Sequence, residues 1–485
     1  MKLKEYTFGF ADSETEFVRN PEIFKTAFYD PQDILNKLLD GNQFILIGNK
    51  GVGKTAYSAK IRSLVDENEN LNAHQVSLAN FEFGTFATLS REDFSGSQKF
   101  KQAWDLTLLI EVYKFLNEIS DYSSVESFYN IIQFLKSNNL MTIDSINTTV
   151  MSFNGLELAY KDFIKLVLGK KVNSIKDYSI KGLIDYFQKG LKDIDFNSTK
   201  SYLIIDGLDD ILRYEKTKIE ILSGLFRSIK HLNDYFYINR INIKIIILAR
   251  EDILSSITDP DFNKIKRDEG ISIAWDNNHH LMEMLKLRFQ FSGLDKDKLD
   301  NCWTEIFPEK INKQSTFIFV LEHTLSRPRD LLQFLVQCQR EFPNLEKINH
   351  SQLKYVLGKF SSSHFYEEMK NELTGFIKDA DIEKLALVFT DLGTTDFSYR
   401  RFTSVANKYF VNKNEEYLIK VFNILFDNGY LGQIIESPDY DKKKKKQIIK
   451  TRLKFKHRNP NLTINLNNKF TLHRGLYKAL NLENN

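Results

Sequence analysis

Cysteine and proline are scarce in this chain of 485 residues. It has 2 cysteines, Cys302 and Cys338, and 8 prolines. Two cysteines cannot supply the clustered thiols of a structural zinc site or a framework of disulfides, which favours a reducing compartment. The low proline content argues against long proline-rich linkers and favours compact, largely helical domains.

The sequence also lacks a long uncharged apolar run. No window approaches the roughly 18 apolar residues of a membrane-spanning helix, and the N-terminal MKLKEYTFGFADSETEF lacks the apolar core of a signal peptide. The 67 basic and 64 acidic residues nearly balance. We therefore expect a cytoplasmic protein without a membrane partner, in which contact with nucleic acid would require a local basic patch.

Residues 48–55 read GNKGVGKT and match the phosphate-binding pattern G-x-x-x-x-G-K-[ST] at every fixed position. The apolar run at 44–47 predicts a buried strand before this loop, and a helix-compatible stretch follows it. Glycines let successive backbone N–H groups surround phosphate oxygens, and the positive end of the next helix points to the same place. We therefore predict a nucleoside triphosphate site. Its expected binding residues are Gly48, Asn49, Lys50, Gly51, Val52, Gly53, Lys54, Thr55 and Ala56.

A metal site is expected beside this loop. Lys54 can reach the β- and γ-phosphates, and the Thr55 hydroxyl can bind Mg²⁺. The strand-like run YLIID at 202–206 ends on Asp206, a carboxylate at the place of a magnesium-binding acid. Thr55 and Asp206 are thus the expected metal ligands, and Lys54 and Asp206 the first catalytic candidates. We expect the Lys54 side chain to be exposed to solvent when no nucleotide is bound.

ATP is favoured over GTP as the nucleotide. GTPases read guanine with an N-K-x-D element late in the fold. The nearest string here is NKIK at 263–266, which lacks the aspartate. ATP and Mg²⁺ are therefore the expected cofactors.

Two later elements contribute arginines. The apolar run IKIIILA at 243–249 predicts a strand that ends at Arg250. In P-loop ATPases with an additional strand between the loop strand and the acid strand, this end faces the γ-phosphate, so Arg250 is a candidate sensor. The stretch SRPRDLLQFL at 326–335 predicts a helix start. Because such an arginine reaches the nucleotide in ATPases with a helical lid, Arg327 and Arg329 are candidates, with solvated arginines as the alternative.

The motifs GNKGVGKT, LIIDGLDD, IIILARED and PRDLL, in this order, resemble those of AAA+/STAND-type P-loop ATPases. They are similar to a bacterial family with a KGxGKT loop, a DGLDD acid strand and an RPRDLL lid helix. This resemblance implies an α/β P-loop NTPase fold with a parallel sheet, a helical lid and a C-terminal winged helix. Relatives of this kind include regulated switches, DNA-loading initiators, and antiphage ATPases that act beside a nuclease or another effector.

One position departs from the AAA+ pattern. AAA+ machines commonly place a catalytic glutamate directly after the magnesium aspartate, whereas here Gly207 occupies that position. STAND-type relatives carry the acid three or four residues further on, and a carboxylate near the γ-phosphate orients the attacking water. Asp209 and Asp210 are both candidates, and their spacing does not decide between them. The departure indicates slow turnover, typical of a switch rather than a fast motor.

The remaining sequence predicts three further parts. Helical periodicity at 104–119, 124–137 and 180–194 predicts a helical insertion at 82–200, which either supports the ATPase core or forms a docking surface. Strands are also expected near 74–80 and at 271–275. The proposed division is a P-loop ATPase core (1–280), a helical lid (281–360) and a winged-helix domain (361–485).

The C-terminal third has the order of a winged helix, three helical patterns and then the strand-like segments RLKFKH and NLTINL/KFTLH. The stretch DKKKKKQIIKTRLKFKHR at 441–458 is its most basic part. It suits contact with the phosphates of nucleic acid, with a solvated loop as the alternative.

Two functions compete on these grounds. The first is an ATP-binding and ATP-hydrolysing regulatory switch, which forms a homo-oligomer and controls a partner effector encoded nearby, such as a nuclease, in bacterial antiphage defence. The second is a DNA-loading ATPase of the initiator or transposition-helper type that binds duplex DNA through the winged helix. A scaffold that binds ATP without hydrolysing it is a third alternative.

Overall fold

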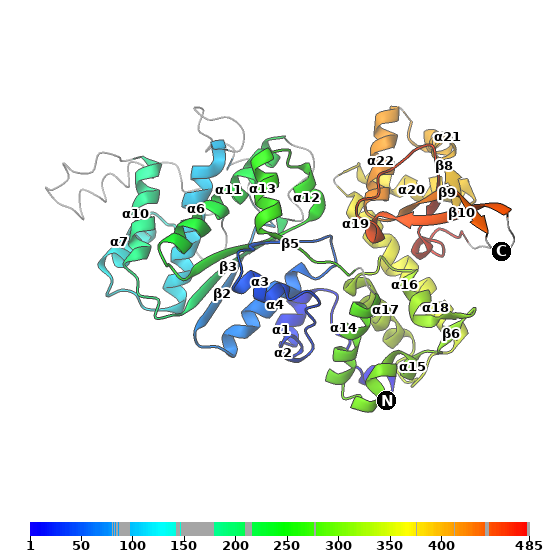
Figure 1. Cartoon of the computed structure of the whole chain (residues 1–485), viewed down its shortest axis with the longest axis horizontal. Helices are drawn as coiled ribbons and strands as arrows, with labels where there is room; N and C mark the ends of the chain where they lie inside the picture. The colour runs from blue at the N-terminus through cyan, green and yellow to red at the C-terminus, as the bar shows by residue number, and fades with distance from the viewer. Residues whose placement is uncertain are drawn as a thin grey trace. The chain divides into compact units, whose positions relative to one another are not determined.

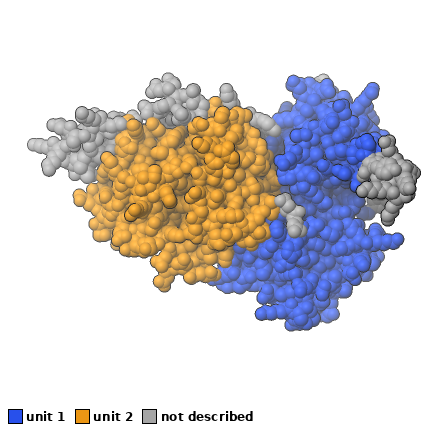
Figure 2. All heavy atoms as spheres, viewed as in Figure 1, with its two compact units in different colours: residues 1–29, 275–485 blue, residues 30–274 orange. Residues whose placement is uncertain are grey.

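The computed structural model of the chain describes all residues except 80, 82, 84–85, 87–97, 142–145, 147–178, 209–215, 276–277, 375, 412, 442–445 and 483–485. The described residues form two compact units. Residues 30–274 make up the sheet unit, orange in Figure 2, and residues 1–29 with 275–485 make up the helical unit, blue in Figure 2. The division into core, lid and winged-helix domain stays a prediction.

A five-stranded parallel sheet lies at the centre of the sheet unit (Figure 1). Its strands are β1 (Ile45–Ile47), β2 (Leu71–Ser77), β3 (Lys200–Asp206), β4 (Ile243–Ala249) and β5 (Gly270–Ser272), in the order β2-β3-β4-β1-β5. All four pairings are parallel. The segments ILI in β1 and IIILA in β4 are buried at every residue. Strands covered on both faces need such continuous apolar runs. This is the predicted α/β fold of P-loop NTPases, and β4 lies between the loop strand and the acid strand as expected.

Helices cover both faces of this sheet (Figure 1), with α3 and α4 on one face and α6 and α11 on the other. The helices of the sheet unit are α3 (Ile34–Leu39), α4 (Lys54–Ser63), η2 (Leu64–Asp66), α6 (Gln98–Ile119), α7 (Glu126–Ser137), α10 (Ile180–Lys192), α11 (Lys216–Ile238), α12 (Glu251–Ser256) and α13 (Pro260–Glu269). The predicted insertion is helical where it is described, as α6, α7 and α10. Its apolar side chains share one core with the sheet, and the Trp104 indole of α6 donates a hydrogen bond to the Ile221 carbonyl of α11 at 2.9 Å.

The helical unit begins with the N-terminal residues and continues after the sheet unit. Its first elements are η1 (Leu3–Glu5), α1 (Ser13–Arg19), α2 (Glu22–Thr26), α14 (Asn278–Phe291), η5 (Lys296–Asn301), α15 (Cys302–Ile306), β6 (Lys310–Ile311), β7 (Gln314–Ser315), α16 (Thr316–Leu321), α17 (Pro328–Glu341), α18 (His350–Phe360), η6 (Ser361–Phe365) and α19 (Tyr366–Leu373). A buried ion pair ties the two chain segments together, because Arg288 of α14 donates to the Glu16 carboxylate of α1 at 2.9 Å and to the Phe8 carbonyl at 3.1 Å. Among the described residues, no helix is both long and apolar enough to cross a bilayer.

The C-terminal elements combine three helices with an antiparallel sheet. They are α20 (Asp379–Leu392), β8 (Asp396–Ser398), α21 (Tyr399–Tyr409), α22 (Glu415–Asp427), β9 (Leu431–Asp441), β10 (Lys446–Phe455), η7 (Lys456–Arg458), β11 (Lys469–Leu472) and η8 (Arg474–Leu476). The strand order is β10-β9-β11-β8. Of the last predicted strand segment only KFTL forms a strand. NLTINL at 461–466 lies outside the ladder, and the Asn465 N–H donates to the Gln433 side chain at 2.7 Å instead.

Candidate functional site

The phosphate-loop residues lie at the carboxyl end of β1, as predicted. The Gly48 N–H donates to the Ala249 carbonyl at 3.1 Å, so the loop leaves the sheet beside the end of β4. Gly51 and Gly53 have φ values of 80° and 102°, in the left-handed region that favours glycine. The helix α4 begins at Lys54, which places its N-terminal end directly after the loop. This geometry supplies backbone donors to an anion.

Lys54 is buried, with only 7% of the residue exposed, so the expectation of an exposed side chain is wrong. Its Nζ donates to the Gly48 carbonyl at 3.1 Å and to the Asn49 carbonyl at 3.3 Å. The loop folds around its own lysine because a buried ammonium needs acceptors, and backbone carbonyls provide them. A phosphate oxygen is a stronger acceptor than a neutral carbonyl. The ammonium is therefore held beside the place where the loop would receive phosphate.

The structure brings Thr55 and Asp206 together, although they are far apart in the sequence. The Thr55 Oγ1 donates to the Asp206 Oδ2 at 3.0 Å, and the other carboxylate oxygen accepts from the Gly207 N–H at 2.7 Å. A hydroxyl and a carboxylate are oxygen ligands of the kind that Mg²⁺ takes from protein, together with phosphate and water. Within the described part of the chain, no group of three or more His, Cys, Asp or Glu residues could hold a metal alone. The pair therefore fits a magnesium ion that takes its other ligands from nucleotide and water.

Gly207 is required by the backbone at the end of β3. Its φ is 85°, and a Cβ there would lie 2.7 Å from the Ala79 backbone nitrogen and 2.9 Å from the Ser77 Oγ. The ends of β2 and β3 thus leave no room for a side chain in this conformation. A glutamate at this position, as in AAA+ machines, would require the backbone of this turn to shift. The alternative carboxylates, Asp209 and Asp210, lie outside the described residues.

Arg250 directly follows β4 and is held by an acid that no motif predicted. Its guanidinium donates two hydrogen bonds to the Asp252 carboxylate, from Nε at 2.9 Å and from Nη2 at 2.6 Å. Burial alone would raise the pKa of Asp252, but the Arg250 charge, these hydrogen bonds, the Ile253 N–H and the Lys54 charge together hold it below its usual value. An acid two residues after a strand-end arginine was the only signal in the sequence.

The two lid candidates, Arg327 and Arg329, have acidic neighbours within the helical unit. Arg327 is 9% exposed and lies 3.7 Å from the Asp330 carboxylate and 3.8 Å from the Glu372 carboxylate. Arg329 donates to the Ala11 carbonyl at 3.4 Å and lies 3.8 Å from the Glu368 carboxylate. Neither is a fully solvated arginine. Their contact with a nucleotide stays a prediction.

Two side chains of the basic stretch 441–458 bond to other parts of the helical unit. Arg458 donates to the Leu321 carbonyl at 3.3 Å and to the Ser326 hydroxyl at 3.4 Å, and Lys456 donates to the Leu462 carbonyl at 2.8 Å. These two side chains thus support the helical unit. Lys450 and Arg452 are exposed on β10, at the edge of the C-terminal sheet. Four lysines of the run, at 442–445, lie outside the described residues.

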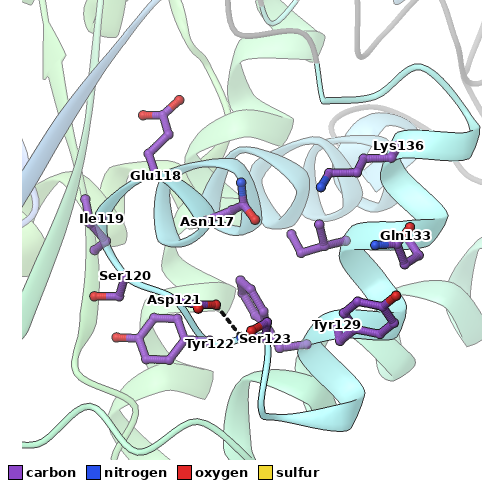
Figure 3. Close-up of a pocket in the computed structure, with 12 residues that line it drawn as sticks. Asn117, Glu118, Ile119, Ser120, Asp121, Tyr122, Ser123, Tyr129, Gln133 and Lys136 are labelled. Carbon is purple, nitrogen blue, oxygen red and sulfur yellow. Dashed lines mark hydrogen bonds between the residues drawn. The ribbon is translucent and has the colours of Figure 1, made fainter.

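A hollow of about 500 Å³ lies in the insertion, between the end of α6 and α7 (Figure 3). Its lining is mostly polar, and Asn117 and Lys136 point toward one another across it. None of the phosphate-loop residues lines it. The hollow is therefore separate from the predicted nucleotide site, and nothing in its chemistry selects one ligand.

Sequence comparisons add two findings. A family model described as the FunZ-associated C-terminal helical domain matches residues 279–367. The putative transposon gamma-delta 80.3 kDa protein of Escherichia coli (strain K12) is 23% identical over 374 residues, which cover 74% of this chain and 51% of that protein. The chain thus spans about half the length of this curated relative.

Solved structures with a similar arrangement include two Aeropyrum pernix proteins. The ORC1 protein in complex with DNA is 11% identical with a TM-score of 0.40, and the match covers 90% of this chain and 93% of that one. The ORC2 protein in ADPNP-ADP complexes is 12% identical with a TM-score of 0.41, over 96% of this chain and 98% of that one. Because both scores are low, the fold assignment rests on the strand order and loop of this chain itself.

Proposed function

We propose that this chain is an ATP-binding and ATP-hydrolysing regulatory switch of the AAA+/STAND type. The observation that carries the proposal is the 3.0 Å hydrogen bond between Asp206 and Thr55, the last residue of a complete phosphate loop. It joins the two oxygen ligands that a magnesium-nucleotide complex needs from the protein. Lys54 adds a fixed positive charge within the same loop.

Each residue has a distinct role in this proposal. The backbone N–H groups of the loop and of the first turn of α4 would bind phosphate oxygens. Lys54 would exchange its two carbonyl acceptors for phosphate oxygens, and Thr55 with Asp206 would hold Mg²⁺, which neutralises charge on the β- and γ-phosphates. Asp209 or Asp210 would orient the attacking water. Since Gly207 leaves no room for a neighbouring glutamate, we expect slow turnover.

The proposal of what this switch controls is based on the sequence motifs and not on a contact with a partner. The resemblance to STAND-type ATPases supports a homo-oligomer that forms with ATP and controls an effector such as a nuclease, in bacterial antiphage defence. Slow turnover suits this role, because a switch must persist in its ATP state.

A second candidate is a DNA-loading ATPase, and the C-terminal elements favour it. The order α20, β8, α21, α22 and the β9–β10 hairpin is that of a winged helix, and the E. coli relative is named as a transposon protein. However, α22, in the place of a recognition helix, exposes Glu415, Glu416 and Asp427. Acidic side chains repel phosphate, so we propose that any contact with DNA uses the basic edge strand β10 and does not read bases.

The size of the protein in solution separates these candidates. We expect a non-hydrolysable ATP analogue with Mg²⁺ to produce a larger assembly than ADP does, as measured by light scattering after size exclusion. Assembly that requires duplex DNA would favour the DNA-loading function instead. An unchanged size in every nucleotide, with or without DNA, would contradict both and leave a scaffold.

The edge strand has its own test. Replacing both Lys450 and Arg452 by glutamate should weaken binding to duplex DNA and lower the slope of log affinity against log salt by about 2, because each lost phosphate contact lowers it by about 1. Affinity would be measured by fluorescence anisotropy between about 50 and 200 mM salt. The matched control is the double substitution K408E/K469E, which makes the same charge change at two exposed lysines outside β10. Equal effects of the two double variants would show that the net charge of the protein, and not a contact of β10 with DNA, sets the affinity.

A further inference from the structure

Asp252 lies at the edge of the sheet where the predicted nucleotide site is built. In the register of the sheet, Ile47 of β1 pairs with Ala249 of β4. The phosphate loop starts directly after Ile47, and Arg250 directly follows Ala249, so the two lie at the same edge. Asp252 is two residues further on, in the first turn of α12. The Lys54 charge also contributes to lowering the pKa of this carboxyl. The Asp252 carboxylate is thus bonded to Arg250, one of the cations that a triphosphate would use, at the end of the strand beside the loop.

We propose that Asp252 is a positioning residue that lowers the preference for ATP over ADP. Its carboxylate binds Arg250 as a γ-phosphate would, and so occupies the arginine when no ATP is bound. The inference rests on the proposed nucleotide-binding function. In it, ATP has to displace the carboxylate from Arg250, whereas ADP does not reach that far. The state without ATP, in which Asp252 binds Arg250, is thereby favoured until ATP is abundant.

The geometry of the pair supports this exchange. Two parallel hydrogen bonds of 2.9 Å and 2.6 Å join the guanidinium to the carboxylate, the arrangement that arginine also forms with phosphate oxygens. The Arg250 side chain is 7% exposed, whereas 37% of the Asp252 side chain is exposed. The carboxylate is therefore the partner that can turn away into solvent, and the arginine stays beside the loop.

Electrostatics gives the direction of the effect. A γ-phosphate that approaches Lys54 and Arg250 meets the negative charge of Asp252, and like charges in a partly buried site repel strongly. ADP carries no γ-phosphate and is affected less. Removing the charge at Asp252 while keeping its shape should therefore strengthen the binding of ATP and leave that of ADP nearly unchanged.

The alternative is a structural role at the start of α12. Asp252 accepts a hydrogen bond from the Ile253 N–H at 3.0 Å, and Arg250, the N-cap residue, makes no side-chain cap of its own. A purely structural carboxylate would alter the melting temperature and affect both nucleotides alike. The ratio of the two affinities separates the roles.

The experiment compares the full chain with its Asp252→Asn variant. Dissociation constants for ADP and for a non-hydrolysable ATP analogue, both with Mg²⁺, would be measured by calorimetry. We expect the preference for the analogue over ADP to rise about tenfold, which corresponds to about 1.4 kcal/mol. In an Arg250→Ala background the same substitution should raise the ratio less, because the competition for Arg250 is gone and only the repulsion between Asp252 and the γ-phosphate is left.

The neighbouring acid provides a matched control. Glu251 stands next to Asp252 on α12 but pairs with Lys266 at 2.7 Å, so Glu251→Gln should leave the ratio unchanged. Asp252→Ser keeps an oxygen acceptor for the Ile253 N–H and repeats the test should the asparagine variant not fold. An unchanged or reduced preference for the analogue, in a parent chain that binds ATP, overturns this inference alone. A parent chain that binds neither nucleotide overturns the proposed function as well.

Discussion

Replacing Asp206 by asparagine should reduce ATP hydrolysis at least about hundredfold, equivalent to about 2.7 kcal/mol of transition-state stabilisation. The carboxylate ends β3, and its Oδ2 accepts the Thr55 hydroxyl at 3.0 Å. An asparagine oxygen can still accept from the Gly207 N–H, so the turn survives. The amide carries no negative charge and has a single oxygen, so it cannot both accept from Gly207 and serve Mg²⁺ and Thr55 as the carboxylate does. Phosphate release at saturating Mg-ATP measures the effect.

A matched substitution tests whether this effect belongs to the site. Asp234 pairs with Lys230 on the surface of α11 at 2.6 Å, and Asp234→Asn makes the same chemical change away from the loop. We expect it to keep the parent rate of hydrolysis and a similar melting temperature. Parent-like hydrolysis by Asp206→Asn would remove Asp206 from the metal site and, with it, the main support for the proposed function.

Replacing Lys54 by alanine should weaken the binding of ATP about hundredfold and remove hydrolysis. The substitution deletes the Lys54 ammonium. Its contacts to the Gly48 and Asn49 carbonyls place this cation among the backbone groups that would bind phosphate. Losing two charge-assisted hydrogen bonds should also lower stability by about 1–3 kcal/mol. Equilibrium binding of a non-hydrolysable ATP analogue and a melting curve separate the two effects.

Two further variants make this test specific. Lys54→Met keeps most of the buried apolar stem, so it should recover stability without recovering affinity, because the charge is still missing. Lys60→Ala removes a lysine six residues further along α4, about 9 Å along the helix axis, and should leave nucleotide binding unchanged. ATP binding by Lys54→Ala at the parent level would show that the nucleotide lies elsewhere.

Much of the fold followed from local patterns. The apolar runs in β1, β3 and β4 predicted strands buried on both faces, and the structure has them within a residue or two of the expected places. The pairing of Thr55 with Asp206 was also predictable, because parallel strands bring their carboxyl ends to one edge of a sheet. The shorter β5 and the missing strand at 461–466 were not, because short strand patterns depend on the partner strand that they find.

Other features depended on contacts that a linear pattern does not contain. Lys54 was expected to be exposed, yet the loop folds its own carbonyls around the ammonium. The basic patch predicted at 441–458 partly serves the fold, since Arg458 donates hydrogen bonds to Leu321 at the end of α16 and to Ser326 before α17. In each case the side chain found an acceptor that only folding brings near it.

Short stretches of the sequence are enough to predict the kind of site in this protein. A complete phosphate loop after a buried strand and an acid at the end of another strand specify their chemistry locally, because glycine conformations, a helix start and oxygen ligands are properties of a few consecutive residues. Which groups face one another became clear from the folded structure. It showed that Gly207 is required by the close approach of β2, and that Asp252 holds Arg250 beside the loop. Such pairings depend on backbone distances of a few ångströms between distant segments, and these are set by the packing of the whole unit.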